Sequence, residues 1–128
     1  MTISKQNGYY LSEPEKYEDF HAGLKIEYYT YVAYFFISDT KVYLAVKENI
    51  KSFSKKDFIP DGMEIEYSIS DKIIDFHYDR GSQFEYHRIF QIQDNHTIID
   101  KRSIKYHWTP FPTETEKNNK PPATKIDS

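Results

Sequence analysis

One charged residue, Arg88, occupies a position where the surrounding pattern favours apolar side chains. It belongs to the alternating series Phe84, Tyr86, Arg88, Phe90 and Ile92, which predicts a strand with these side chains on its inner face. A charge at such a position is unfavourable unless it is paired. In one interpretation Arg88 binds the carboxylate or phosphate of a ligand inside an aromatic cavity. The candidate ligand-binding residues are then Arg88, Tyr67, Tyr86, Tyr106 and Trp108.

In the other interpretation Arg88 lies at the mouth of the fold, stacks on Trp108 or a tyrosine, and reaches solvent. We favour this second role, because an arginine commonly closes the end of a small barrel in this way.

The histidines suggest a metal site by residue type but not by spacing. His77, His87, His96 and His107 form neither an HxH nor an HExxH motif. The strand register that we infer places Glu85 opposite His77 and Asp75 opposite His87, and such outward charge pairs are ordinary on a sheet. We therefore predict neither a metal ion nor a cofactor.

No catalytic motif is present in the sequence. The chain has no cysteine, which excludes disulfides, thiol catalysis and cysteine-ligated zinc. It also lacks a GxSxG motif, a glycine-rich phosphate loop and paired carboxylates at motif spacing. We predict that the protein is not an enzyme.

The longest predicted element is a hairpin built from residues 28–38 and 41–46, with Asp39 and Thr40 as its turn. Aromatic and β-branched residues dominate both runs, which favours strands. Pairing Ser38 with Lys41 puts Phe35 opposite Leu44 on one face. The other face is aromatic and is either covered by a helix or used as a protein interface. Its residues are Tyr28, Tyr34, Phe36 and Tyr43.

Further strands follow from alternation of apolar and polar residues. Residues 63–69 pair with 72–78, and 72–79 with 83–92, so that Ile65 faces Phe76 and Phe76 faces Tyr86. Shorter strands are expected at 8–11, 97–100 and 104–108. A capping-box pattern at Ser12 predicts a short helix over 13–22, and the polar connection 48–62 has room for one helical turn.

These elements predict an all-β fold: a single antiparallel up-and-down β-barrel, or a strongly curled meander sheet, of 7–8 strands with one short N-terminal helix. The barrel domain spans residues 1–109. Residues 110–128 are rich in Pro, Thr, Glu, Lys and Asn and are expected to form a disordered polar tail.

The strand rhythm over residues 8–108 resembles that of the small bacterial lipocalin-like (calycin-type) barrels. The similar stretches are 8–10, 34–43, 62–73 and 84–89, although Tyr10 stands where the lipocalin Gly-x-Trp opening has its tryptophan. The resemblance implies a cavity for an apolar small molecule. It leads us to expect a non-enzymatic binder of an apolar or amphipathic, lipid-like molecule. The tyrosine-rich outer face, the acidic balance and the tail suggest the alternative, a protein-interaction module: an inhibitor, an immunity-type partner or an envelope-complex subunit.

Composition restricts the partners. The net charge is −3 and no basic block is present, so nucleic acid is not an expected partner. No apolar run approaches the ~20 residues of a membrane helix. As written, the chain is expected to be cytoplasmic; it would belong to the cell envelope or be secreted if a signal or lipoprotein segment had been removed.

Overall fold

The computed structural model describes residues 7–79 and 81–112 of the chain. These residues form one antiparallel sheet and a short helix. In chain order the elements are β1 (Gly8–Ser12), β2 (Glu15–His21), β3 (Leu24–Phe36), β4 (Lys41–Glu48), α1 (Lys55–Phe58), β5 (Met63–Ser70), β6 (Ile73–Tyr78), β7 (Tyr86–Asp94), β8 (Thr97–Ile99) and β9 (Lys105–Pro110).

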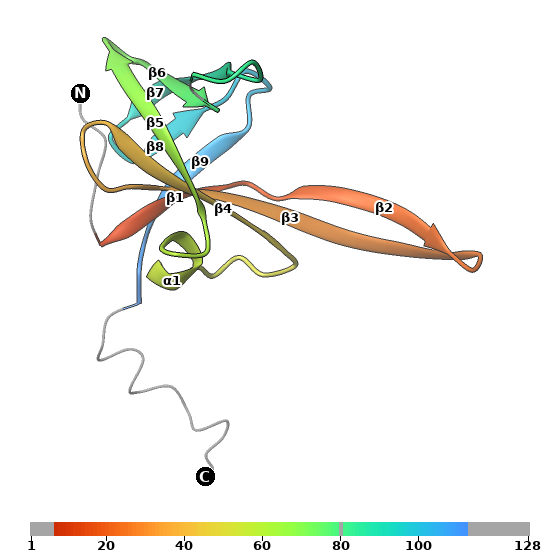
Figure 1. The fold of residues 1–128 in the computed structure, drawn as a ribbon. Coiled ribbons are helices and arrows are strands. Elements are labelled where there is room, and N and C mark those ends of the chain that lie inside the picture. Colours follow the sequence, from red (N-terminus) through yellow and green to blue (C-terminus); the bar gives the residue numbers. More distant parts are fainter. Residues whose placement is uncertain (1–6, 80, 113–128) are drawn as a thin grey trace.

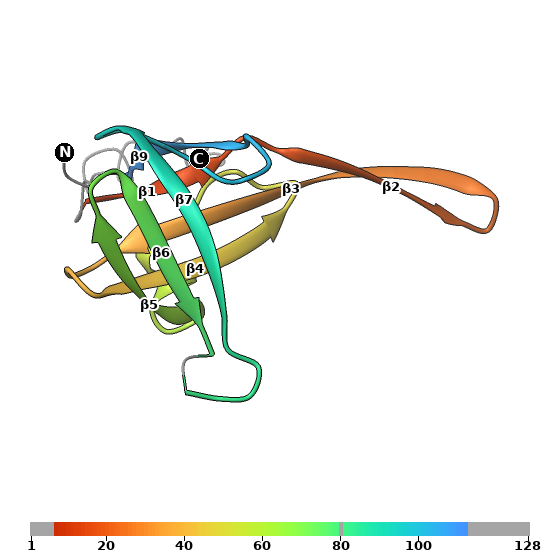
Figure 2. The same ribbon diagram turned by 90° about the horizontal axis from the view of Figure 1, so that it is seen from above.

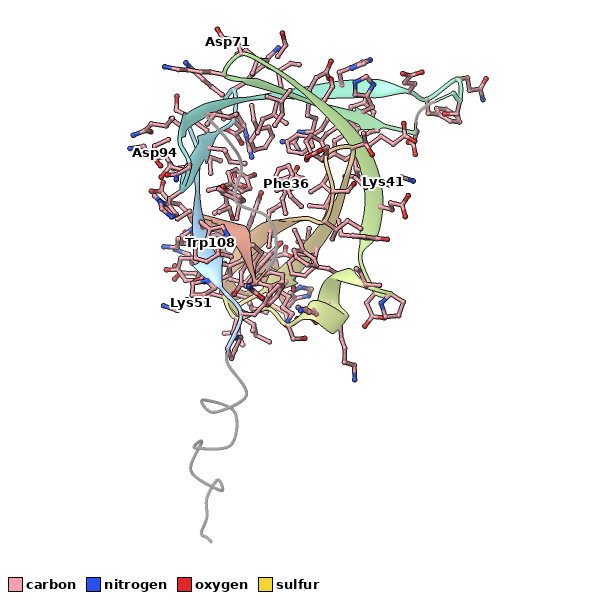
Figure 3. All side chains as sticks on the ribbon, turned by 90° about the vertical axis from the view of Figure 1, so that its left-hand side faces the viewer. Phe36, Lys41, Lys51, Asp71, Asp94 and Trp108 are labelled. Atoms are coloured by element: carbon pink, nitrogen blue, oxygen red, sulfur yellow. The ribbon has the colours of Figure 1, made fainter. Side chains whose placement is uncertain are left out.

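Eight of these strands close into a barrel. Sequence neighbours pair from β3 to β9, and β1 completes the ring because it pairs with β9 on one side and with β3 on the other. Viewed along the barrel, Phe36 lies inside the ring of strands (Figure 3). The prediction of an all-β, up-and-down antiparallel barrel is therefore confirmed.

The ninth strand, β2, lies outside the barrel, and here the predicted N-terminal helix over residues 13–22 is wrong. β2 pairs with Leu24–Thr30 of β3 to form a two-stranded ribbon. Ala22 and Gly23 connect the two strands with φ angles of 53° and 79°, and positive φ at both central residues is what a type I′ hairpin turn requires. The ribbon projects well away from the barrel (Figures 1 and 2). The only helix of the described residues, α1, lies within the connection 48–62, where one helical turn was expected.

The register predicted for the β3–β4 hairpin is wrong by one residue. Phe36 pairs with Val42 and Phe35 with Tyr43, because the turn contains Ser38 as well as Asp39 and Thr40. The Ser38 hydroxyl accepts hydrogen bonds from the backbone N–H groups of Thr40 and Lys41, which stabilises this longer turn. The shift exchanges the two faces of β3, so that Tyr34 and Phe36 point inward and Phe35 points outward, whereas Val42 on β4 keeps its predicted inward position.

The inner face of the next three strands was predicted correctly within the strands, but their register was not. Phe84, predicted on this face, precedes β7 and is 69% exposed. Tyr67 pairs with Phe76, and Phe76 pairs with Arg88, in each case two residues from the predicted partner. A shift of two residues preserves the face. The cause again lies in the turns: Asp71 and Lys72 form the first, and the second is a longer loop that starts at Asp79 and ends at Glu85.

Aromatic rings fill the barrel. Tyr34 stacks on Phe76 with ring centroids 4.6 Å apart, and Phe90 meets Phe76 edge-on at 4.9 Å. The side chains of this interior core are almost completely buried. They belong to Tyr10, Tyr34, Phe36, Val42, Ile65, Tyr67, Ile74, Phe76, Tyr78, Phe90, Ile92, Ile98 and Tyr106.

A second cluster covers the outside of β3 and β4. Phe53 and Phe58, from the connection that holds α1, pack on Phe35 and Tyr9. Both faces of the hairpin are thus covered, as its composition predicts. The covering element is this connection and not an N-terminal helix.

The C-terminal boundary extends beyond the predicted domain end at residue 109. Pro110 belongs to β9, and Phe111 packs against Tyr9 with ring centroids 5.1 Å apart. Residues 113–128 of the predicted tail lie outside the described residues. Within residues 7–79 and 81–112, no helix has the length and apolar character needed to span a membrane.

Candidate functional site

Arg88 points into the barrel, as the alternation of β7 predicts. Its strand partner is the fully buried Phe76, and its guanidinium is close to the hydroxyl groups of Tyr34, Tyr78 and Tyr106, with a hydrogen bond to Tyr78. No ion pair between described residues includes Arg88. Burial lowers the pKa of Arg88, the three phenols raise it, and the net shift is upward, so the group stays charged.

The phenols around Arg88 form a connected polar group in an otherwise apolar core. The hydroxyls of Tyr34 and Tyr78 are hydrogen-bonded at 2.8 Å. Burial raises the pKa of Tyr34, Tyr78 and Tyr106 above the ordinary tyrosine value, so all three keep their protons at neutral pH. Arg88 therefore faces neutral oxygen atoms rather than carboxylates.

Of the predicted ligand-binding tyrosines, Tyr106 lies close to Arg88, but Tyr67 and Tyr86 have other partners. Tyr67 is buried, but its hydroxyl donates to the Ser38 carbonyl at the β3–β4 turn. Tyr86 is 49% exposed and stacks on Tyr78 at 4.7 Å, at the rim. The sequence did not single out Tyr34 and Tyr78 as partners of Arg88, because the predicted register placed Tyr34 outside and Tyr78 opposite Phe84.

Trp108 lies at the far end of the barrel from Arg88. Its backbone N–H donates to the His96 carbonyl at 2.7 Å, beside the turn that follows Asp94. Asp94 lies six positions along β7 from Arg88, which corresponds to roughly 20 Å of strand. The interpretation in which Arg88 stacks on Trp108 is therefore wrong.

A groove rather than an internal cavity adjoins Arg88. It has a volume of about 230 Å³ and lies between the first half of β7 and the turn at Asp100, Lys101 and Arg102. Asp100 is largely occupied by this turn, because its Oδ1 accepts the backbone N–H groups of Arg102 and Ile104. Arg88 and Lys101 also line the groove, whereas Arg102 is paired with Glu15 at 2.7 Å and with Asp100 at 3.6 Å.

The predicted aromatic interface does not exist as one surface. Tyr34 and Phe36 are fully buried inside the barrel, which corrects their assignment. Tyr43 is half-buried and its hydroxyl donates to Glu64 at 3.0 Å. Tyr28 is half-buried on the ribbon, where it stacks on Tyr17 at 5.6 Å. Of the four residues, only Tyr28 belongs to the ribbon, where it lies two residues before the start of the β3–β4 pairing at Thr30.

The projecting ribbon carries several exposed apolar side chains. Leu24 is 70% exposed and Phe20 is 67% exposed, both next to the turn. Tyr17, Ile26 and Tyr29 are each more than 40% exposed. Strand alternation puts Tyr17, Leu24, Ile26 and Tyr28 on one face, and we call these four side chains the apolar ribbon face. Asp19 and His21 lie on the same face, whereas Phe20 lies on the opposite one.

The opposite face of the ribbon is held together by ion pairs. Lys16 and Lys25 each contact both Glu18 and Glu27, at 3.2–3.8 Å. The pKa values of Lys16 and Lys25 are raised and the pKa of Glu27 is lowered, mainly because the paired lysine and glutamate side chains hydrogen-bond each other. These pairs are solvent-exposed, so each stabilises the ribbon only slightly. Sequence reasoning missed the ribbon because the capping pattern at Ser12 favoured a helix; the available signal was Gly23, which can adopt the positive φ of a hairpin turn.

The histidines also differ from their predicted arrangement. His77 pairs with His87 across β6 and β7, and Glu85 lies in the preceding loop. Asp75 hydrogen-bonds His87 at 2.8 Å along a diagonal. His96 and His107 lie elsewhere, on the β7–β8 turn and on β9.

Comparison with known proteins identifies no relative: no family model, no curated protein and no solved structure matches this chain.

Proposed function

We propose that this chain is a non-enzymatic binding protein and that its β2–β3 ribbon recognises a protein partner through the apolar ribbon face. The observation that supports this most strongly is the exposure of Leu24 and Ile26, which are 70% and 44% exposed on an arm that projects from the barrel. The arm contacts other described residues at its base, where Glu15 pairs with Arg102 and the backbone N–H of Tyr29 donates to Asn49. Exposed apolar surface of this kind is typical of interaction sites. A two-stranded ribbon is only marginally stable alone, and a partner would stabilise it.

The charge of the ribbon favours protein over other partners. Residues 15–30 contain four carboxylates and only two lysines. Both lysines are already paired with Glu18 and Glu27. Nucleic acids and anionic membranes attract basic surfaces, so an acidic arm is poorly suited to either. A partner with an apolar groove and a basic rim has the complementary chemistry.

The backbone of the ribbon offers a second kind of contact. β2 is the last strand in the sheet order, and the pairing of β3 with β4 begins only at Thr30. Both long edges of the ribbon tip therefore present backbone groups to which a partner strand could add. Pairing of β2 with the β2 of a second copy is disfavoured, because Glu18 and Asp19 at its centre would face like charges.

The test is copurification from the native cells. Wild-type protein should copurify with one stoichiometric partner, and Leu24→Glu with Ile26→Glu should lose it, because both changes put charge on the apolar ribbon face. Ile73→Glu is the matched control, since Ile73 is similarly exposed on β6 of the barrel. Loss of the partner with Ile73→Glu but not with the ribbon variant would refute the proposal, as would a complex made only of copies of this chain.

The groove beside Arg88 supports a second candidate function, the carrier of a small anionic amphipathic molecule that the lipocalin-like resemblance implies. The supporting observation is a half-buried guanidinium with no carboxylate partner among the described residues. Dodecanoate serves as the probe. Saturable binding that Arg88→Leu abolishes and Lys105→Leu leaves intact would support this function; binding that survives Arg88→Leu would exclude it.

A further inference from the structure

Two histidines and an aspartate converge on the outer surface of the barrel. His77 on β6 lies directly opposite His87 on β7, and Asp75 precedes His77 by two residues, on the same face. The two imidazole rings are 4.4 Å apart between centroids. The three residues come from adjacent, regularly paired strands, so the backbone holds them in a fixed arrangement.

The ligand atoms of these residues are oriented toward one another. The two Asp75 carboxylate oxygens contact different rings: Oδ1 lies 2.8 Å from His87 Nδ1, and Oδ2 lies 3.5 Å from His77 Nε2. One ligand atom from each residue can be chosen so that all three lie within 4.8 Å of one another. Ligands of one tetrahedral zinc ion are about 3.4 Å apart, a difference that side-chain rotation can close.

The cluster has an unsatisfied nitrogen and a negative surrounding. His77 Nδ1 is buried without a hydrogen-bond partner among the described residues, which is unfavourable for a polar atom. Glu85 Oε2 lies 3.7 Å from His87 Nε2, and Glu66 is the strand partner of His77 on the other side. These carboxylates would stabilise a cation and could orient its imidazole ligands.

We propose that Asp75, His77 and His87 bind a divalent transition-metal ion of the zinc class. Two imidazoles and one carboxylate form a ligand set suited to such ions rather than to Mg²⁺ or Ca²⁺, which favour oxygen ligands. The His87 side chain is 45% exposed, so solvent reaches the site and water occupies the remaining coordination positions. The site involves no residue of the ribbon; His87 also lines the groove beside Arg88.

The test uses full-length, tag-free protein that has been treated with a chelator and dialysed. Co²⁺ is titrated and followed by its visible absorption, and Zn²⁺ is then added to displace it. The expected result is saturation at one ion per chain. His77→Gln and His87→Gln should each weaken binding at least about tenfold, the loss that even a residue outside the first coordination shell can produce. Asp75→Asn should weaken it as well.

The matched control is His107→Gln. His107 is an exposed histidine on β9 that contacts Glu13 at 3.3 Å, and it belongs to no cluster of three metal-ligating side chains among the described residues. This change should leave the affinity unchanged. Equal weakening by His107→Gln, or no saturable spectrum with wild-type protein, would overturn the proposal. If His77→Gln fails to fold, which circular dichroism would reveal, the exposed His87→Gln still decides the question.

Discussion

The aromatic layer outside β3 and β4 gives the sharpest stability prediction, for the substitution Phe58→Ala. Phe58 is fully buried on α1, and its ring lies 5.4–6.0 Å from those of four other residues. Its removal leaves a cavity that rigid strands on one side cannot collapse into. Phe→Ala changes at such sites destabilise a protein by about 3–5 kcal/mol. The four neighbouring rings belong to Tyr9, Phe35, Phe53 and Phe111.

Urea unfolding measured by circular dichroism tests this value. With a slope of about 2 kcal/mol per molar urea, the midpoint should fall by roughly 2 M. The matched control is Phe84→Ala, because Phe84 is 69% exposed in the β6–β7 loop. That change should alter the free energy of unfolding by less than about 0.5 kcal/mol.

The result would also decide how the outer face of the hairpin is used. A loss below about 1 kcal/mol for Phe58→Ala would mean that the layer is not packed, so that β3 and β4 present an open aromatic face. In that case the face, and not the ribbon, would become the better candidate for an interface.

Three further predictions concern the barrel itself. Arg88→Leu should leave the free energy of unfolding within about 1 kcal/mol of wild type or raise it, because a desolvated charge is removed; a fall of more than about 2 kcal/mol in urea unfolding would contradict this. Gly8→Ala should lower the melting temperature, since the added methyl would lie 2.5 Å from the Trp108 ring and 2.7 Å from a backbone oxygen; an unchanged melting temperature would refute that contact. Burial raises the pKa of Tyr67 to about 12, above its ordinary value, so its contribution to stability is complete below about pH 10 and is lost as the pH rises toward 12. Tyr67→Phe should flatten this alkaline fall in the free energy of unfolding, and an equally steep fall would show that other groups cause it.

The sequence predicts the strands of the barrel better than their pairing. Alternation alone places Ile65, Tyr67 and Phe76 on the inner face, because burial of one face requires a period of two. Register depends on turn length, which depends on local hydrogen bonds such as those of Ser38. Alternation carries no information about those bonds.

The candidate sites show the same division. The inward position of Arg88 is predictable from its own strand. Its contacts with Tyr34 and Tyr78 depend on the registers of two hairpins, and both predicted registers are wrong. The opposition of His77 and His87 is likewise a consequence of register. The ribbon is missed for another reason: the Ser12–Glu15 capping pattern is local, whereas the pairing of Tyr17 with Tyr28 spans the turn.

Site-specific photo-crosslinking in the native cells tests the central claim, recognition of a protein by the ribbon, most directly. A photoreactive phenylalanine analogue placed at Leu24 or Ile26, both on the apolar ribbon face, should form one predominant adduct with a different protein. The same analogue at Phe84, an equally exposed ring on the barrel, should not form it. An adduct that forms equally well from Phe84, or only with a second copy of this chain, would contradict the proposed role of the ribbon.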